Sequence, residues 1–271
     1  MPRPLEGKTV ALAEGRQLEE LVALLEREGA VTLRYPLLSI LDAPDPAPVL
    51  DWLALLIADR FHRVILMTGE ALRRLAGFAE RAGLHEQFVA ALSADALSCA
   101  ADRSLASRLR ELGLQPTETA PAPTTQGVLT ALSTVDLDGK TVGITLYGSP
   151  NPTLTEFLTQ RGATVVPVMP YVLAPAADDD RVADLIHRLE GGTVDVLVFT
   201  SSPQVDRAWE VAEKMHLLPS LQAGLERTRI AAVGPLVADA LRQRGASVAI
   251  CPQQGWQMKN LVRQIARALE S

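Results

Sequence analysis

The feature of this sequence that most restricts its fold is an internal repeat. The tetrapeptide Gly7-Lys8-Thr9-Val10 recurs as Gly139-Lys140-Thr141-Val142, and residues 64–68 (VILMT) are answered by residues 196–200 (VLVFT). The offset is 132 residues in both cases, as from Gly7 to Gly139, which is close to half of the 271-residue chain. The repeat predicts a duplicated unit and two similar lobes, with a ligand site expected in the cleft between them.

Composition and charge narrow the classes of partner. The chain is long enough for two domains, each with its own core. A formal net charge of -6 offers no general basic surface, and 4% aromatic residues offer few platforms for stacking bases, so we expect no nucleic-acid partner. No apolar run approaches the ~18 residues of a membrane span, and no signal peptide is visible. We therefore expect a cytoplasmic protein without a membrane partner.

Each half of the chain alternates short aliphatic runs with amphipathic stretches, a pattern typical of parallel sheets covered by helices. In the first half, we expect strands at 9–13, 31–35, 63–67 and 97–101, and helices at 18–27, 49–57, 71–82, 105–112 and 128–132. In the second half, we expect strands at 142–146, 164–168, 194–199, 229–233 and 247–250, and helices at 153–161, 181–189, 204–214, 237–244 and 258–269. The predicted fold class is α/β.

Two proline-containing segments interrupt this alternation at nearly the same place in each repeat. Tyr35-Pro36-Leu37 and Met169-Pro170-Tyr171 both follow the second expected strand of their half. Proline ends the pairing of a strand and favours an extended conformation in the residue before it. Both segments are therefore predicted to be places where the chain crosses between lobes.

The sequence contains none of the common catalytic or nucleotide-binding motifs. Its two cysteines and four histidines show no metal-ligand spacing, so we expect no metal site. Small polar residues instead follow the expected strands. Ligands of open α/β sheets bind outside the carboxyl ends of the strands, where helix N-termini present free N–H groups.

The candidate anion-binding residues at these turns are Thr68, Gly69, Ser149, Thr200, Ser201, Ser202 and Gly234. The alternative interpretation of each serine and threonine is a helix N-cap with no further role.

These segments resemble the uroporphyrinogen-III synthase family. The resemblance covers nearly the whole chain and is carried by residues 196–205 (VLVFTSSPQV), 231–248 (AAVGPLVADALRQRGASV) and 145–175, which include TLYGSP and MPYVLAP. It implies two lobes of parallel sheet flanked by helices, with the first strand–helix unit exchanged, joined by two extended linkers.

The resemblance also implies the domain boundaries. The first lobe would contain residues 1–36 and 172–271, and the inserted second lobe would contain residues 37–171. The repeat alone would suggest a simple cut near Asp138.

The activity implied by the resemblance is that of a lyase in tetrapyrrole biosynthesis. Such an enzyme cyclises hydroxymethylbilane to uroporphyrinogen III, with inversion of the terminal ring and loss of water, and it needs no cofactor. The implied partner is hydroxymethylbilane as a small-molecule substrate. We also expect a monomer that makes transient contact with hydroxymethylbilane synthase.

One tyrosine after the second strand of the later repeat is important in the family, and Tyr171 matches it here. A phenol is protonated at neutral pH, so it can donate a hydrogen bond to the departing hydroxyl group and then face the cationic intermediate with its ring. The resemblance therefore assigns Tyr171 as the catalytic residue. The alternative is a linker tyrosine packed between lobes.

The sequence departs from the family at three turns. Many members carry a threonine where Leu105 and Val237 stand here, and an arginine where Ala13-Glu14-Gly15 stands. The lost threonines favour the alternative hypothesis, a non-catalytic tetrapyrrole-binding sensor or regulatory module of the same fold.

Overall fold

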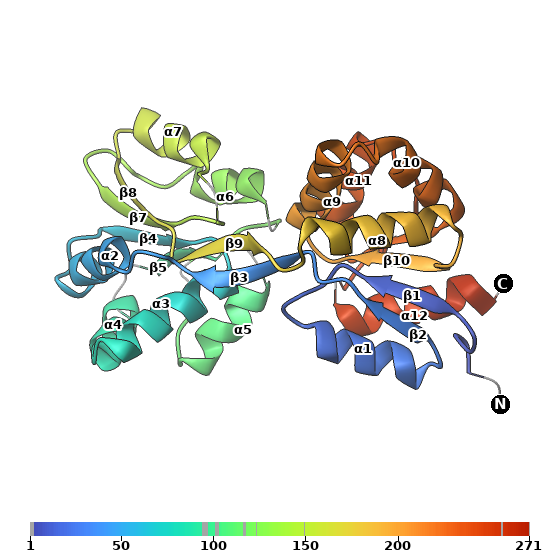
Figure 1. Cartoon of the computed structure of the whole chain (residues 1–271). Coiled ribbons are helices and arrows are strands. Elements are labelled where there is room, and N and C mark those ends of the chain that lie inside the picture. Colours follow the sequence, from blue (N-terminus) through green and yellow to red (C-terminus); the bar gives the residue numbers. More distant parts are fainter. Residues whose placement is uncertain are drawn as a thin grey trace. The chain divides into compact units, whose positions relative to one another are not determined.

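The computed structural model (Figure 1) describes residues 3–93, 97–100, 103–115, 118–122, 124–148, 150–255 and 257–270. The chain divides into two compact units, of which the first contains Met1–Ile40 and Ala174–Ser271 and the second contains Leu41–Leu173. The boundaries expected from the sequence, at 36/37 and 171/172, lie a few residues before the boundaries of these units at 40/41 and 173/174.

The first unit contains a five-stranded parallel sheet in the order β12-β11-β10-β1-β2. Its strands are β1 (Thr9–Leu12), β2 (Val31–Arg34), β10 (Val196–Phe199), β11 (Arg229–Ala232) and β12 (Val248–Ile250). Its helices are α1 (Leu18–Arg27), α8 (Asp179–Glu190), α9 (Ser202–Lys214), α10 (Leu218–Arg227), α11 (Pro235–Gln243) and α12 (Met258–Glu270).

The second unit contains an equivalent parallel sheet in the order β6-β5-β4-β7-β8. Its strands are β4 (Arg63–Leu66), β5 (Leu97–Ala100), β6 (Glu118–Thr119), β7 (Thr141–Thr145) and β8 (Thr164–Val168). Its helices are α2 (Ala47–Ile57), α3 (Gly69–Arg81), α4 (His85–Ser93), α5 (Arg103–Glu111), α6 (Thr125–Leu132) and α7 (Pro152–Gln160).

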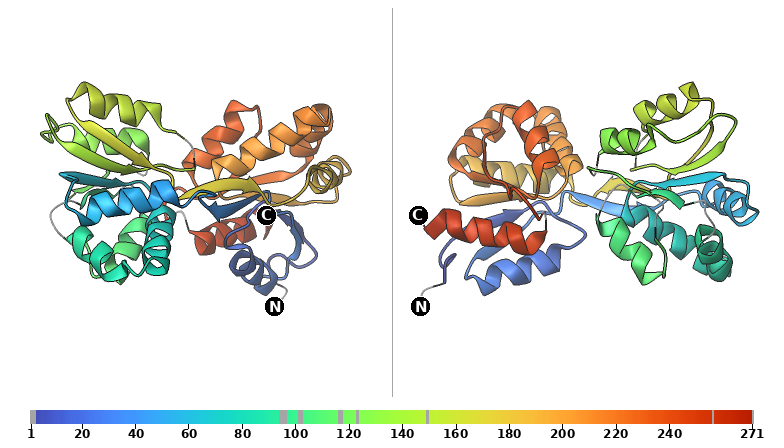
Figure 2. Two further views of the ribbon diagram at one scale, coloured as in Figure 1. Left: turned by 60° about the vertical axis from the view of Figure 1, so that its left-hand side comes forward. Right: turned by 180° about the vertical axis from the view of Figure 1, so that it is seen from behind.

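Alternation along the central strands explains why each sheet carries helices on both faces. In β10, Leu197 and Phe199 pack with α8–α11, whereas Val196 and Val198 pack with α1 and α12 on the other face. Successive side chains of a strand point to opposite faces, so a strand buried on both sides is apolar throughout. Figure 2 shows α1 and α12, the first and last helices, side by side on their face of the first sheet.

The expected exchange of the first strand–helix unit is confirmed by the strand order. β1 and β2 join β10–β12 from the far end of the chain, and β7 and β8 join β4–β6 from the first half. A simple cut near Asp138 would have left each sheet without two strands. The two copies of the repeat therefore occupy equivalent positions in two different sheets. Val10 of β1 pairs with Val196 of β10, and the equivalent Val142 of β7 pairs with Arg63 of β4.

Two strands carry the chain between the units. β3 (Leu38–Asp42) and β9 (Tyr171–Pro175) follow the two proline segments and pair as a two-stranded sheet. The amide of Ala43 donates to Pro170 and the amide of Ala176 donates to Leu37, so the two strands run antiparallel. The expected extended linkers are therefore confirmed, and they are paired with each other.

The sequence-based prediction missed α4, α10 and the two-residue strand β6. Helices α4 and α10 occupy equivalent positions, after α3 and after α9. Each is short, and only Phe88 and Leu92 in α4, or Leu221 and Leu225 in α10, show the helical spacing of buried residues. Two apolar positions are a weak periodic signal, which is why these segments read as loops.

We predict that Gly224→Ala in α10 destabilises the chain, although alanine favours helices. A Cβ at this position would lie 2.6 Å from the Cβ of Leu189 and 2.8 Å from the backbone of Glu190, at the end of α8. We expect a loss of about 1–3 kcal/mol in the free energy of unfolding, measured with urea. The matched control is Gly77→Ala in α3, where the nearest atom is a guanidinium nitrogen of Arg81, at the far end of a long side chain, at 3.4 Å. That variant should gain about 0.5–1 kcal/mol, and equal effects of the two changes would contradict the packing argument.

Candidate functional site

In the second unit, the turn from β4 into α3 brings two of the predicted site residues together. Thr68 is the N-cap of α3, and its hydroxyl oxygen accepts a hydrogen bond of 3.0 Å from the amide of Ala71. The same oxygen lies 3.4 Å from the hydroxyl of Tyr171, the first residue of β9. Gly69 is the first residue of α3. A phenol therefore lies beside a helix N-terminus at the carboxyl end of a parallel strand.

The ring of Tyr171 is almost fully enclosed, with 1% of its surface exposed. The ring of Tyr147 meets it edge-on, with 6.3 Å between ring centroids. Gly148 adopts φ +61°, and a Cβ there would lie 3.1 Å from Leu173. The segment after β7 thus packs closely against Tyr171. Ser149, also predicted as a site residue, lies outside the described residues.

An ion-pair cluster fixes the first turn of α3. The buried carboxylate of Glu70 accepts hydrogen bonds from Arg73 and from Arg74, and Arg74 also pairs with Asp42 at 2.5 Å. Burial alone raises the pKa of Glu70, but the bonds and charges of the two arginines outweigh burial and hold its pKa below the ordinary value. Glu70 is therefore a negative charge that its neighbours neutralise.

The equivalent turn of the first unit, from β10 into α9, is filled by its own side chains. The amide oxygen of Gln204 accepts hydrogen bonds from the backbone N–H groups of Thr200, at 2.8 Å, and Ser201, at 3.2 Å. These two N–H groups belong to the turn that leads into α9, next to the first N–H groups of the helix, where anions commonly bind. Leu72 is the first-turn residue at the matching place in α3, and its apolar side chain cannot accept such bonds.

A buried carboxylate completes this arrangement. Glu14, at the end of β1 and 6% exposed, accepts a short hydrogen bond from the hydroxyl of Thr200 and a 3.4 Å bond from Gln204. The amide of Gln17 donates to its other oxygen at 2.9 Å. The hydroxyl of Thr200, which we expected to contact a substrate carboxylate, is thus already donated to a carboxylate of the protein.

The remaining predicted residues of the first unit lie at two adjacent helix starts. Ser202 begins α9, and its hydroxyl donates to the carbonyl of Leu236 at 3.4 Å. Gly234 is the N-cap of α11 and has no side chain with which to cap it. The first N–H groups of a helix have no partner inside the helix. The start of α11 therefore has no side-chain cap from Gly234, whereas Gln204 occupies the two amides that precede α9.

The two positions that lack the family's threonine are both core positions. Val237 is 5% exposed and Leu105 is fully buried, and each packs in the hydrophobic core of its own unit. The apolar side chains are stabilised there by burial of their surface.

Sequence analysis missed Gln204 as an internal acceptor and the role of Glu14. The spacing Ser201-Ser202-Pro203-Gln204 is a capping pattern, so the first was visible in the sequence. The second was not, because Glu14 and Thr200 are 186 residues apart.

Within the described part of the chain, no three His, Cys, Asp or Glu residues are grouped so that they could hold a metal ion. No helix there is long and apolar enough to cross a membrane.

Comparison with known proteins decides the family. Residues 19–263 match the family described as Uroporphyrinogen-III synthase HemD. The chain belongs to this family. The resemblance noted from the sequence is therefore confirmed over most of the chain.

Solved structures and curated proteins agree with this membership. A mutant uroporphyrinogen III synthase from the extremely thermophilic bacterium Thermus thermophilus is 28% identical, with a TM-score of 0.76 over 97% of this chain and 99% of its own. A protein of Bacillus subtilis (strain 168), named Uncharacterized protein YjjA, is 31% identical over 93% of both chains. The uroporphyrinogen-III synthetase of Helicobacter pylori 26695 is 14% identical with a TM-score of 0.55, over 97% of this chain and 99% of its own, and so shares the fold alone.

We predict that Glu70→Gln makes the stability of the chain less sensitive to acid. Because the pKa of Glu70 is lowered by folding, its ion pairs contribute fully above the ordinary pKa of about 4.5, and the contribution is lost as the pH falls through the folded pKa. At pH 7 the variant should lose about 1–3 kcal/mol of unfolding free energy. The curves of wild type and variant should approach each other below the ordinary carboxyl pKa and meet below the folded pKa of Glu70.

The matched control for this change is Glu80→Gln, an exposed residue of the same helix. Urea unfolding at a series of pH values should give the wild-type pH dependence for this control. Parallel curves for Glu70→Gln and wild type would contradict the assignment of the ion pairs.

Proposed function

We propose that this chain is a uroporphyrinogen-III synthase, a lyase that cyclises hydroxymethylbilane with inversion of the terminal ring and loss of water. The observation that carries the proposal is the phenol of Tyr171 within 3.4 Å of Thr68, at the N-terminus of α3, in a member of this family. We further propose that it acts as a cytoplasmic monomer, that it needs no cofactor, and that it takes its substrate from hydroxymethylbilane synthase.

The chemistry of the substrate sets what the protein must supply. Hydroxymethylbilane loses its terminal hydroxyl group readily and can close unaided to the isomer without ring inversion. The enzyme must therefore hold one folded geometry of the chain of pyrroles, which is a task of positioning more than of strong acids and bases. The carboxylates of the substrate are the groups that the protein can bind to position it.

Tyr171 is the proposed group for hydroxyl loss. Its phenol donates a hydrogen bond to the departing hydroxyl, and Thr68 orients the phenol through the neighbouring oxygen. The electron-rich ring then faces the cationic intermediate. Because the ring is 1% exposed, the proposal requires the segment with Tyr147 and Gly148 to move aside when substrate binds.

The proposed carboxylate contacts differ between the units. In the second unit they come from the first amides of α3, at Gly69, and from Ser149. In the first unit they come from the helix start at Gly234 and from the hydroxyls of Ser201 and Ser202, of which Ser202 exchanges its bond to the Leu236 carbonyl for one to the substrate. Thr200 is the weakest of the original candidates, since its hydroxyl and its amide are both engaged within the protein. Each charge-assisted bond contributes roughly 1.5–3 kcal/mol.

A second candidate function is a tetrapyrrole-binding sensor that does not turn over. The buried carboxylate of Glu14 at the carboxyl end of β1 favours it, because a fixed negative charge opposes binding of substrate carboxylates at that turn. The amide oxygen of Gln204 at the turn into α9 also opposes binding of a substrate carboxylate there, because it already accepts hydrogen bonds from the backbone N–H groups. A protein with this arrangement binds a tetrapyrrole mainly through its second unit.

We predict that the chain, added in catalytic amount to hydroxymethylbilane generated in situ, yields mostly the type III isomer. The products are oxidised and the type I and type III porphyrins are separated by chromatography. Tyr171→Phe should lower the rate of type III formation by about 10²-fold or more, as expected for loss of a general acid. Tyr35→Phe is the matched control, since it removes a buried hydroxyl that bonds Asp184 in the first unit.

The outcomes separate the two candidate functions. Type I alone, from wild-type protein shown to be folded, would reject the synthase and favour the sensor. A sensor should bind uroporphyrinogen with equal affinity before and after Tyr171→Phe, and should show no turnover in either form. Equal losses in Tyr171→Phe and Tyr35→Phe would show that the assay reports folding and not the phenol.

A further inference from the structure

The paired strands β3 and β9 place a carboxylate next to the proposed catalytic phenol. The interstrand hydrogen bonds donated by Ala43 and by Ala176 fix the register of these two strands, which lie side by side in Figure 1. In this register Asp42, the last residue of β3, lies opposite Tyr171, the first residue of β9. Residues directly opposite each other on antiparallel strands have side chains on the same face. The side chains of Asp42 and Tyr171 are therefore neighbours on one face of the two-stranded sheet.

Both of these side chains contact the beginning of α3. The hydroxyl of Tyr171 lies 3.4 Å from that of Thr68, the N-cap of the helix. Asp42 accepts a hydrogen bond of 2.5 Å from Nη1 of Arg74. Nε of the same guanidinium donates to Glu70, in the first turn of α3, at 2.7 Å. Arg74 therefore links the residue opposite Tyr171 to the helical turn that follows Thr68.

The link through Arg74 is largely enclosed. The side chain of Arg74 is 16% exposed and that of Glu70 is 6% exposed. A planar guanidinium group presents its N–H groups in a fixed fork, so it can bond two carboxylates at once and hold them in one geometry. Pairs shielded from water also interact more strongly than pairs at the surface. The link thus has the rigidity that a positioning role requires.

The neighbouring arginines of α3 do not make the same link. Arg81 donates to Asp42 at 2.8 Å, but its side chain is 57% exposed, so water weakens the pair. Arg73 donates to Glu70 at 2.6 and 3.0 Å and, within the described part of the chain, makes no bond to Asp42. Of these three arginines, Arg74 is the one that bonds both carboxylates.

We propose that Arg74 is a positioning residue, which acts through Asp42 and the pairing of β3 with β9 to hold Tyr171 beside Thr68. This inference rests on the proposed synthase activity, in which the phenol of Tyr171 assists loss of the hydroxyl group. Displacing a reacting group by about 1 Å can lower a rate by about 10²-fold. Because the phenol acts on the departing group, loss of Arg74 affects the chemical step more than the binding of substrate.

The first measurement needs no substrate. The chain has three tyrosines, so their ring resonances can be assigned in the full chain with Tyr171→Phe and Tyr35→Phe. Because the ring of Tyr171 packs edge-on against that of Tyr147, its resonance responds to small displacements. In Arg74→Gln the Tyr171 resonance should move by more than its linewidth, while that of Tyr35 stays in place.

The second measurement is the assay of type I and type III products. Arg74→Gln should lower kcat for type III formation by about tenfold or more and leave KM within about twofold of wild type. Asp42→Asn breaks the same link from its other end with little change in shape, and it should change the Tyr171 resonance and kcat in the same direction. Since the Asp42 side chain is 37% exposed, this second variant tests the link even if Arg74→Gln does not fold.

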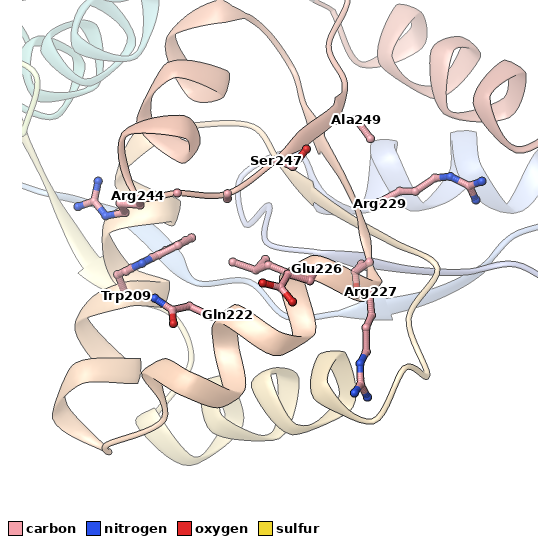
Figure 3. A pocket seen from close by; sticks show the side chains of 12 residues that line it. Trp209, Gln222, Glu226, Arg227, Arg229, Arg244, Ser247 and Ala249 are labelled. Atoms are coloured by element: carbon pink, nitrogen blue, oxygen red, sulfur yellow. The ribbon is translucent and has the colours of Figure 1, made fainter.

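Two other arginines provide matched controls. Arg73→Gln removes a guanidinium group from Glu70 and leaves the bonds of Asp42 in place. Arg244→Gln breaks an ion pair of similar length, 2.7 Å to Asp206, in the first unit. Figure 3 shows Arg244 at a cavity of that unit, and it is the C-cap of α11, at the opposite end of this helix from the proposed carboxylate contact. Both controls should keep the wild-type ring resonance and kcat, whatever they lose in urea unfolding.

Three results would each overturn the proposal. The first is a wild-type Tyr171 resonance in both Arg74→Gln and Asp42→Asn. The second is an equal loss of kcat in Arg73→Gln and Arg74→Gln, which would show that the stability of α3 matters and the link does not. The third is a raised KM with wild-type kcat in Arg74→Gln, which would indicate a contact with substrate. Absence of type III product from wild-type protein would instead reject the synthase, and a moved Tyr171 resonance in Arg74→Gln would still support the link.

Discussion

The parallel pairing at the centre of each sheet is the constraint on which the rest of the molecule depends. β1 lies between β10 and β2, and β7 lies between β4 and β8. In both sheets, neighbouring central strands come from opposite halves of the sequence. The chain must therefore cross between the units twice, and the pairing of β3 with β9 holds those crossings together. Tyr171 owes its place beside Thr68 to this second crossing, since it begins β9.

The sequence predicted the parts of the fold that depend on local patterns. Apolar runs located the core strands, and the repeat indicated that they occupy equivalent places. The strand order could not be read from those patterns, because Val10 and Val142 carry the same local sequence and say nothing of which strand each pairs with. Family resemblance supplied the exchange. Short helices such as α4 were not predicted, because two buried residues, Phe88 and Leu92, do not define a helical period.

The candidate site could be predicted from the sequence only in part. Local sequence located small polar residues at strand ends, but hydroxyl groups at equivalent turns have unlike partners. Thr68 lies near a phenol 103 residues away, and Thr200 donates to a carboxylate 186 residues away. The duplicated turns have thus diverged: the hydroxyl of Thr68 caps α3, whereas the hydroxyl and the amide of Thr200 are engaged by Glu14 and Gln204. Only long-range contacts distinguish the turn of Thr68 from that of Thr200, because the local sequence is the same in both, a threonine after an apolar strand.

The exchanged strands also affect how the chain folds as it is synthesised. Leu41–Leu173 is a continuous segment, so the second unit can fold as soon as the ribosome has released it. The β1-α1-β2 segment is made before this unit but lacks β10 as a neighbour until most of the chain has been made. During that interval Val10, Ala11 and Leu12 have no sheet to enter, although all three are fully buried in the finished protein. β1 is therefore made before the whole second unit and is nevertheless among the last strands to be protected from aggregation or from capture by chaperones.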